Sequence, residues 1–187
     1  MEFLAFLQDK EFFSDEDCVI IDAAFNSITI DKGVPGQEVD KHSDMVIFIE
    51  SGLLRTFYYK DGKDITHFFF DENYFVAPVD TIYWGEKAAY QWESVEPSKL
   101  KAIKFIDLMA IEERFPRISR VILDFSIQMN HLLSMKLNLV QFQTASDRYN
   151  LFLEMYPNLN NRVSLGDTAS FLGVTQQTLS VIRGQKR

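Results

Sequence analysis

Cysteine and histidine are both scarce in this chain of 187 residues, which holds one cysteine, Cys18, and three histidines. A single cysteine excludes an internal disulfide, a zinc site built from several thiolates and a four-cysteine iron–sulfur cluster. The chain also lacks an apolar run of about 20 residues, the length that a membrane-spanning helix requires. Its first segment, Met1–Glu11, is interrupted by acids, unlike a secretory signal with its basic head and apolar stretch. These absences predict a cytoplasmic protein with no membrane segment and a reduced thiol.

Negative charge exceeds positive charge, and the excess is unevenly distributed. The formal net charge is −8, but residues 1–144 carry 14 Lys and Arg against 24 Asp and Glu, whereas residues 145–187 carry 5 against 3. The last part of the chain is therefore slightly basic. Its cations can act locally because salt screens charges beyond about 10 Å. A hydrophobic content of 47%, which includes 17 Phe, is enough for a sizeable core.

Residues 1–115 begin with a helical pattern and continue as many short strands. Helical spacing runs over residues 2–25, with Ser14 as a cap near the middle. Short apolar or alternating runs follow, separated by turn signals such as Lys32-Gly33 and Asp61-Gly62. The runs are Ser27–Ile30, Met45–Glu50, Leu53–Tyr59, Ile65–Phe70, Gln91–Val95 and Leu100–Phe105. Many short strands with regular turns predict a β-sandwich or β-roll, and the fold class is therefore α+β.

Residues 116–145 are predicted to form one long helix, because neither glycine nor proline interrupts the stretch after Pro116. Apolar residues spaced alternately by three and four indicate a partner helix of the same kind, and so a homodimer. These interface residues are Ile118, Ile122, Phe125, Met129, Leu132 and Leu139. The alternative is that this stripe packs on the roll of its own chain. Both arrangements can coexist, because a second apolar line is formed by Val121, Leu133, Leu137 and Val140.

Residues 146–187 contain a pattern typical of a helix-turn-helix, at Ser164–Gly184. Two short stretches with inward apolar faces flank Gly173, which permits a sharp turn, and Ser164 and Thr175 can cap the two helices. The second helix is sized for the DNA major groove, where glutamine can pair with adenine and arginine with guanine or phosphate. The predicted DNA-binding residues are Thr175, Gln176, Gln177, Ser180 and Arg183. The alternative is a helical packing unit with a solvated polar face.

The order of roll, long helix and helix-turn-helix resembles the cyclic-AMP receptor protein/Fnr (Crp/Fnr) family of bacterial transcription regulators. The resemblance covers about Phe12 to Arg183 and rests on three groups of residues. They are Phe48–Arg55; Asp61-Gly62-Lys63 with Phe70–Asn73; and Ala169, Leu172-Gly173-Val174, Leu179-Ser180 and Ile182-Arg183. The resemblance implies a jelly roll of the cyclic-nucleotide-binding type, a homodimer joined by the long helix, and a DNA-reading domain that recognises a near-palindromic operator.

The nucleotide pocket of that family is matched only in part. The family uses a Gly-Glu pair, whose glutamate holds the ribose, and an Arg-Ser pair that neutralises the cyclic phosphate. Here Asp71 precedes Glu72, and the Arg-Ser positions fall on Ala88-Ala89, which offer a phosphate neither charge nor hydroxyl. The degenerate pocket would comprise Glu72, Asn73, Lys87, Ala88 and Ala89. Lys87 is either a substitute cation or an ordinary solvated loop residue. Cyclic AMP is therefore not the expected effector, and an unidentified small molecule stays open.

The DNA-reading part also departs from the family pattern. Relatives commonly place an acidic and a basic residue on the recognition helix where this chain has Gln177 and Val181, and most continue into a β-hairpin wing. No wing is expected here. Phosphate contacts would then come from Arg183, Lys186, Arg187 and helix N-termini, so we expect a modest affinity for DNA.

Two alternatives of other classes stay open. A β-roll can be a metal-dependent cupin, and Gly36, His42, Glu50 and Gly52 partly match the first ligand motif of that family. Asp44 stands where a second histidine is needed, so a three-histidine site cannot be assembled, and no metal, cofactor or catalytic residue is expected. The other alternative is a dimeric module that binds a ligand or a protein without DNA activity.

Overall fold

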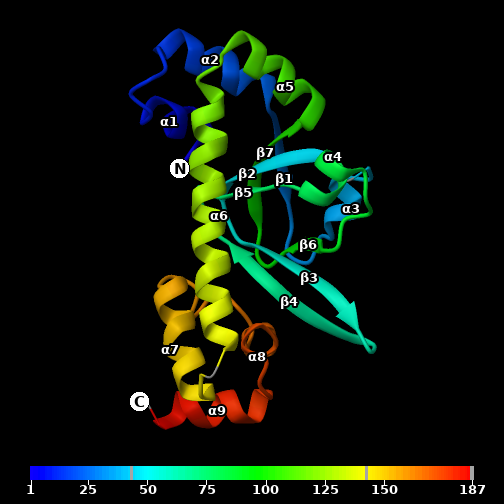
Figure 1. Ribbon diagram of the computed structural model, residues 1–187, viewed down its shortest axis with the longest axis vertical. Helices are drawn as coiled ribbons and strands as arrows, with labels where there is room; N and C mark the ends of the chain where they lie inside the picture. The colour runs from blue at the N-terminus through cyan, green and yellow to red at the C-terminus, as the bar shows by residue number, and fades with distance from the viewer. Residues whose placement is uncertain (43, 142, 186–187) are drawn as a thin grey trace. The chain divides into compact units, whose positions relative to one another are not determined.

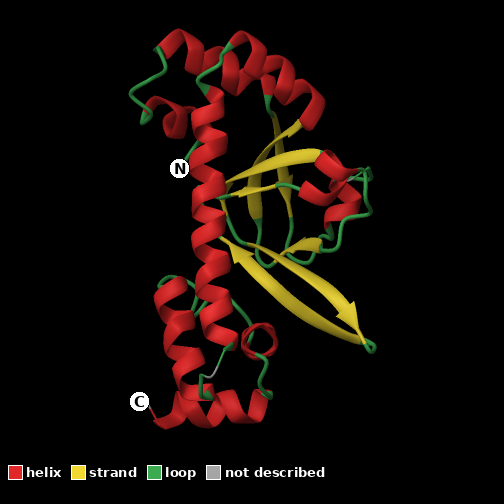
Figure 2. Cartoon of the chain, in the orientation of Figure 1, coloured by secondary structure: helices red, strands yellow, loops and turns green. Residues whose placement is uncertain are grey.

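The computed structural model describes residues 1–187 except 43, 142, 186 and 187. The helices are α1 (Phe3–Gln8), α2 (Asp15–Ala24), α3 (Gly36–Val39), α4 (Val79–Trp84), α5 (Phe105–Arg114), α6 (Ile118–Val140), α7 (Ala145–Met155), α8 (Leu165–Leu172) and α9 (Gln176–Gln185). The strands are β1 (Asn26–Ile30), β2 (Met45–Ser51), β3 (Leu54–Lys60), β4 (Lys63–Phe70), β5 (Phe75–Val76), β6 (Gln91–Ser94) and β7 (Ser98–Lys104). Figure 1 traces these elements along the chain, and Figure 2 separates helix from strand. The predicted α+β class is confirmed.

Packing divides the chain into two compact units. The first consists of Met1–Thr56 and Phe69–Phe125, and the second of Phe57–Phe68 and Ser126–Arg187. The long helix α6 and the strands β3 and β4 each contribute residues to both units. The predicted domains are residues 1–115 for the roll, 116–145 for the dimerisation helix and 146–187 for the DNA-reading part. They stay a prediction, and the two packing units begin and end at other residues.

The first unit is built on an antiparallel sheet with the strand order β1-β7-β2-β5. Its core combines this sheet with α1, α2, α5 and the start of α6. The buried members are Phe3, Leu7, Cys18, Ile21, Phe25, Val46, Phe48, Phe75, Ile103, Leu108, Ile118 and Val121. The ring centroid of Phe48 lies 4.9 Å from that of Phe3 and 5.0 Å from that of Phe75. Many of the chain's phenylalanines therefore bury their rings together, where tilted contacts add to the gain from burial.

A second sheet has the strand order β4-β3-β6, and its strands β3 and β4 form a hairpin. Asp61 and Gly62 link them with φ angles of 52° and 73°. Two consecutive positive φ angles define a type I′ turn, whose twist matches that of the flanking strands. The Asp-Gly turn signal is thus confirmed, and the hairpin tip, Phe57–Phe68, belongs to the second unit. The pattern missed α3, α4 and the two-residue β5, which are too short to show a period, and it also missed the ten-residue helix α5.

The second unit joins the hairpin tip to the end of α6 and to α7, α8 and α9. Thr144 caps α7, since its side chain accepts a hydrogen bond of 3.2 Å from the Asp147 amide. Phe171 on α8 packs against two rings of the α7 region, with centroid distances of 5.6 Å to Phe152 and 5.7 Å to Tyr156. No helix among the described residues is long and apolar enough to cross a bilayer.

The predicted dimer-interface residues of α6 differ in how far the folded chain buries them. Three of the six predicted residues, Ile118, Leu132 and Leu139, are buried in the folded chain, and Ile122, Phe125 and Met129 are partly buried. The exposed apolar residues of α6 are Leu123, Ile127, Leu133, Leu137 and Val140. Three of these belong to the second apolar line of the sequence pattern. The six predicted residues pack largely against their own chain, because the apolar face of a helix is buried against the core that it can reach.

Candidate nucleic-acid interface

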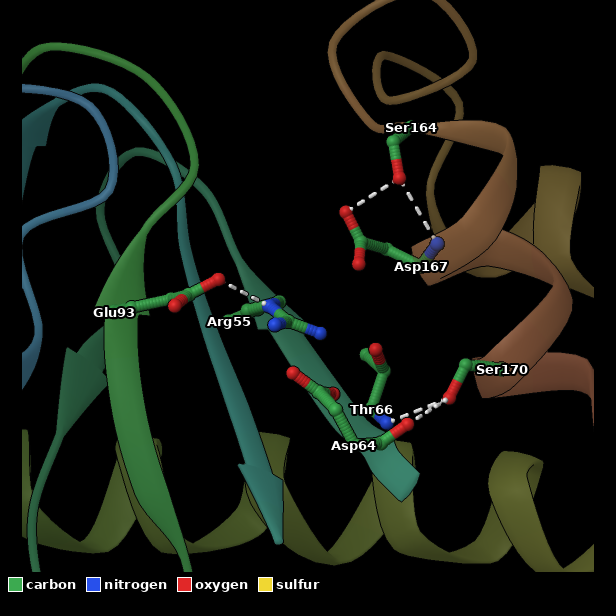
Figure 3. Close-up of polar contacts among 7 residues, drawn as sticks. All are labelled: Arg55, Asp64, Thr66, Glu93, Ser164, Asp167 and Ser170. Atoms are coloured by element: carbon green, nitrogen blue, oxygen red, sulfur yellow. Dashed lines mark hydrogen bonds and ion pairs between the residues drawn. The ribbon is translucent and has the colours of Figure 1, made fainter. Parts of the chain in front are cut away.

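Helix α8 and helix α9 form the predicted helix-turn-helix, and each begins at the predicted cap. The Ser164 side chain accepts a hydrogen bond of 3.0 Å from the Asp167 amide at the start of α8, and Thr175 accepts one of 3.1 Å from the Thr178 amide at the start of α9. Figure 3 shows the cap at Ser164. Between the helices, Gly173 has a φ of 66°, a left-handed conformation that ends α8 and lets the chain turn.

The exposed face of α9 lies opposite its buried side. Leu179 is fully buried and Ile182 is 8% exposed, so these two residues anchor the helix in the second unit. Four of the five predicted DNA-binding residues, Thr175, Gln176, Gln177 and Ser180, are exposed. Val181, which is not among the predicted DNA-binding residues, is 60% exposed. The face open to a ligand is therefore polar and uncharged, with one valine on it.

Arg183 does not lie on that open face. Its Nη2 donates a hydrogen bond of 2.8 Å to Oδ1 of Asn160 and one of 3.2 Å to the Asn160 carbonyl. The Tyr149 hydroxyl donates to the same Asn160 Oδ1 at 3.1 Å. Arg183 was predicted to contact DNA, but in the folded chain its guanidinium ties α9 to the loop between α7 and α8. Helical periodicity could not reveal this, because a long side chain at the edge of a face can turn either way.

Two cations stabilise the C-terminal end of α8. Lys136 on α6 donates a hydrogen bond of 2.6 Å to the Phe171 carbonyl, and its Nζ lies 3.3 Å from the centroid of the Phe171 ring. Arg148 on α7 donates one of 3.1 Å to the Leu172 carbonyl. These carbonyls carry the negative end of the helix dipole, so both cations are favourably placed. The contacts hold α8, and with it the turn into α9, against the helices that precede it in the chain.

The tip of the β3–β4 hairpin also holds α8, through one hydroxyl group. The Thr66 amide donates a hydrogen bond of 2.9 Å to Ser170 Oγ, which in turn donates one of 3.2 Å to the Asp64 carbonyl. In Figure 3 the Ser170 side chain points at the backbone of β4. Because β4 lies at the edge of its sheet, the Ser170 hydroxyl forms the hydrogen bonds that a neighbouring strand would otherwise form with these backbone groups. The sequence carried no signal for this contact, which joins residues more than 100 positions apart.

Two side chains of the second unit have lowered pKa values. Burial, and secondarily the positive charge of Lys136, lowers the pKa of His67 on β4 from 6.5 to about 4. Burial, and secondarily the charge of Arg148, lowers the pKa of Lys136 from 10.5 to about 7. The physical cause is the same in both cases, because a partly buried cation loses hydration and meets a like charge.

The predicted effector-pocket residues lie in the first unit. Glu72 Oε1 accepts a hydrogen bond of 2.9 Å from the Gly52 amide, so this carboxylate already stabilises a turn of the roll. Asn73 has a φ of 69° and its amide donates to the Ile49 carbonyl at 2.9 Å. Lys87 and Ala89 are exposed, whereas Ala88 is partly buried. The Ala89 amide donates to Asp80 Oδ2 at 3.1 Å.

A partly buried ion pair between β3 and β6 was not anticipated from the sequence. Arg55 on β3 is 6% exposed, and its Nε donates to Glu93 Oε1 on β6 at 2.7 Å, as Figure 3 shows. Nearby, the Trp92 ring lies so close to Gly36 that a β-carbon at that glycine would fall 2.3 Å from it. Arg55 is thus a cation inside the roll that already has an acidic partner, and Trp92 fills space beside α3.

An antiparallel roll, a long helix and a capped helix-turn-helix follow one another in this chain. Comparison with known proteins shows which solved structures share this fold. No protein-family model and no curated protein matches the chain. Solved structures do match it, at low sequence identity. A CooA mutant from Carboxydothermus hydrogenoformans has a TM-score of 0.72 at 16% identity, covering 98% of this chain and 84% of that one.

Two further structures extend the comparison. CLP of Xanthomonas campestris, described as a global regulator responsive to cyclic di-GMP, has a TM-score of 0.71 at 13% identity, with 92% of this chain and 91% of that one covered. A candidate transcriptional regulator of the Crp/Fnr family from Eubacterium rectale has a TM-score of 0.67 at 12% identity, with 92% and 83% covered. The chain therefore has a Crp/Fnr-like fold, as its motifs predicted.

Proposed function

We propose that this protein is a DNA-binding transcription regulator of the Crp/Fnr type, homodimeric and without enzymatic activity. The observation that carries the proposal is the capped helix-turn-helix, whose second helix buries Leu179 and Ile182 and leaves Gln176, Gln177 and Ser180 exposed. A helix anchored on one side and polar on the other can enter a major groove without unfolding. Within the described residues, no group of three or more His, Cys, Asp and Glu is arranged to hold a metal ion.

The homodimer would form through the exposed apolar face of α6. Leu123, Ile127, Leu133 and Leu137 are each at least 50% exposed, and Val140 is 47% exposed. Exposure of such a row of apolar side chains to water is unfavourable, and a second copy of the same helix would bury it. The double substitution Leu133→Glu and Leu137→Glu should give monomers, measured by light scattering. A wild-type protein that is monomeric at micromolar concentration would contradict this part of the proposal.

Cyclic AMP is not the proposed effector. Ala88 and Ala89 supply no charged or hydroxyl partner for a cyclic phosphate, and Lys87 is exposed on a loop. The buried cation of the roll, Arg55, is already paired with Glu93. A phosphate in the roll would therefore lack a charge-assisted hydrogen bond from these positions. Calorimetry with cyclic AMP and cyclic GMP should show weak binding or none, and micromolar affinity for either would refute this.

The function itself is tested by selecting bound sequences from a random pool of DNA duplexes. An enriched near-palindrome would establish DNA binding, two-fold symmetry and the spacing of the half-sites in one experiment. The variant Gln176→Ala with Gln177→Ala should lose the enriched sequence. Gln128→Ala is the matched control, because Gln128 is exposed on α6 and is not on the exposed face of α9.

A second candidate is a dimeric ligand- or protein-binding module without DNA activity. It is favoured by the orientation of Arg183, since the described part of α9 then presents no cation to a phosphate backbone. Lys186 and Arg187, which were expected to contact phosphate, lie outside the described residues. A stable dimer that shifts no duplex at any salt concentration would support this candidate over the regulator.

A further inference from the structure

The exposed face of α9 has a chemical character that bears on which bases it can read. Its exposed positions carry amides, hydroxyls, a glycine and a valine; they are Gln176, Gln177, Thr178, Ser180, Val181, Gly184 and Gln185. Reading of guanine in the major groove relies on arginine or lysine, which donate two hydrogen bonds to its O6 and N7. Arg183, the cation of α9 within the described residues, donates instead to Asn160. This face therefore lacks the usual guanine reader.

Gln177 and Val181 stand one helical turn apart, at positions i and i+4. Side chains at that spacing lie on the same face of a helix. Both are exposed, and Val181 is 60% exposed although the neighbouring Ile182 is buried. A glutamine amide can bond adenine N6 and N7 at once, and an apolar side chain can pack on the C5-methyl group of thymine. Each of the two side chains thus matches a feature of A·T pairs.

We propose that Val181 determines specificity together with Gln177, so that each half-site carries an adenine read by Gln177 and, at a neighbouring base pair, a thymine whose methyl group packs on Val181. This inference rests on the proposed function. An exposed valine side chain does not stabilise the free protein. Contact with a thymine methyl group would remove apolar surface of both the valine and the thymine from water, which favours binding. The described residues of this face carry no cation, which also predicts that base contacts supply an unusually large share of the affinity.

The test uses the full-length protein and the sequence enriched from the random pool. Thymines of the half-site are replaced one at a time by uracil, which lacks the methyl group. At one position this change should weaken wild-type binding by about fourfold, the value of one buried methyl group. The Val181→Ala variant should bind the thymine and uracil duplexes equally at that position. Gln128→Ala should keep the wild-type ratio.

The adenine contact is tested in the same duplex with 7-deazaadenine, which lacks the N7 acceptor. Wild-type binding should fall by about tenfold at one position, and Gln177→Ala should be insensitive to the change. Enrichment of guanine at the positions facing α9, or an equal uracil effect in wild type and Val181→Ala, overturns this inference and leaves DNA binding intact. If no sequence is enriched and no duplex binds, the proposed function fails, and this inference fails with it.

Discussion

Replacement of Ser170 by alanine tests whether the hairpin tip holds the helix-turn-helix in solution. In the wild type the Ser170 hydroxyl accepts from the Thr66 amide at 2.9 Å and donates to the Asp64 carbonyl at 3.2 Å. Thr66 is only 2% exposed, so water reaches its amide poorly. Loss of this acceptor from a buried amide costs about 1–3 kcal/mol. Alanine is the better helix former by roughly 0.5 kcal/mol, which offsets part of the loss.

The net expectation is a decrease of about 0.5–2.5 kcal/mol in the free energy of unfolding, measured by urea titration with an unchanged m-value. Hydrogen exchange gives a local readout, because the Thr66 amide should exchange at least tenfold faster in Ser170→Ala. Ser180→Ala is the matched control, since Ser180 is an exposed serine on α9, and its effect should stay within about 0.5 kcal/mol. Unchanged stability and unchanged exchange at Thr66 would show that the contact does not form in solution.

Three further predictions concern the second unit. NMR titration should show His67 protonating near pH 4, and Lys136→Met should raise that pKa, because the Lys136 charge helps to lower it. The folded-state pKa lies below the ordinary 6.5, so the unfolded chain binds the proton more readily, and the free energy of unfolding should fall as pH drops from about 6.5 to about 4. Arg183→Met should lower the free energy of unfolding by about 1–3 kcal/mol in thermal denaturation, because it removes charged hydrogen bonds to Asn160; an effect on DNA affinity alone would contradict the observed orientation. Gly173→Ala should cost about 1 kcal/mol or more in the same assay, because φ is 66° there; an unchanged melting temperature would rule out the left-handed turn.

The helix-turn-helix could be predicted because its signals are local. Ser164, Gly173 and Thr175 act on groups within a few residues of themselves, so a cap or a left-handed turn is visible in a short stretch of sequence. The same holds for the Asp61-Gly62 turn, which satisfies the twist of its own two strands. The order of these local elements was enough to indicate a Crp/Fnr-like fold.

The packing of the folded chain selects which of the two apolar lines of α6 is buried. Helix α6 carries two apolar lines, and periodicity shows that both exist without showing which one meets the chain's own core. Packing buried Leu132 and Leu139 and left Leu133 and Leu137 exposed, so the residues available to a partner changed. That choice depends on segments distant in sequence, which no local pattern encodes.

The polar contacts divide in the same way. The apolar side of α9 with Leu179 and its polar side with Gln177 could be predicted from sequence, because a period of 3.6 residues separates them. The contacts of Arg183 with Asn160 and of Ser170 with the edge of β4 could not, because they depend on how distant segments pack. A hydrogen bond depends on the final placement of both partners to within a few tenths of an ångström, and for distant partners that placement is a property of the whole fold.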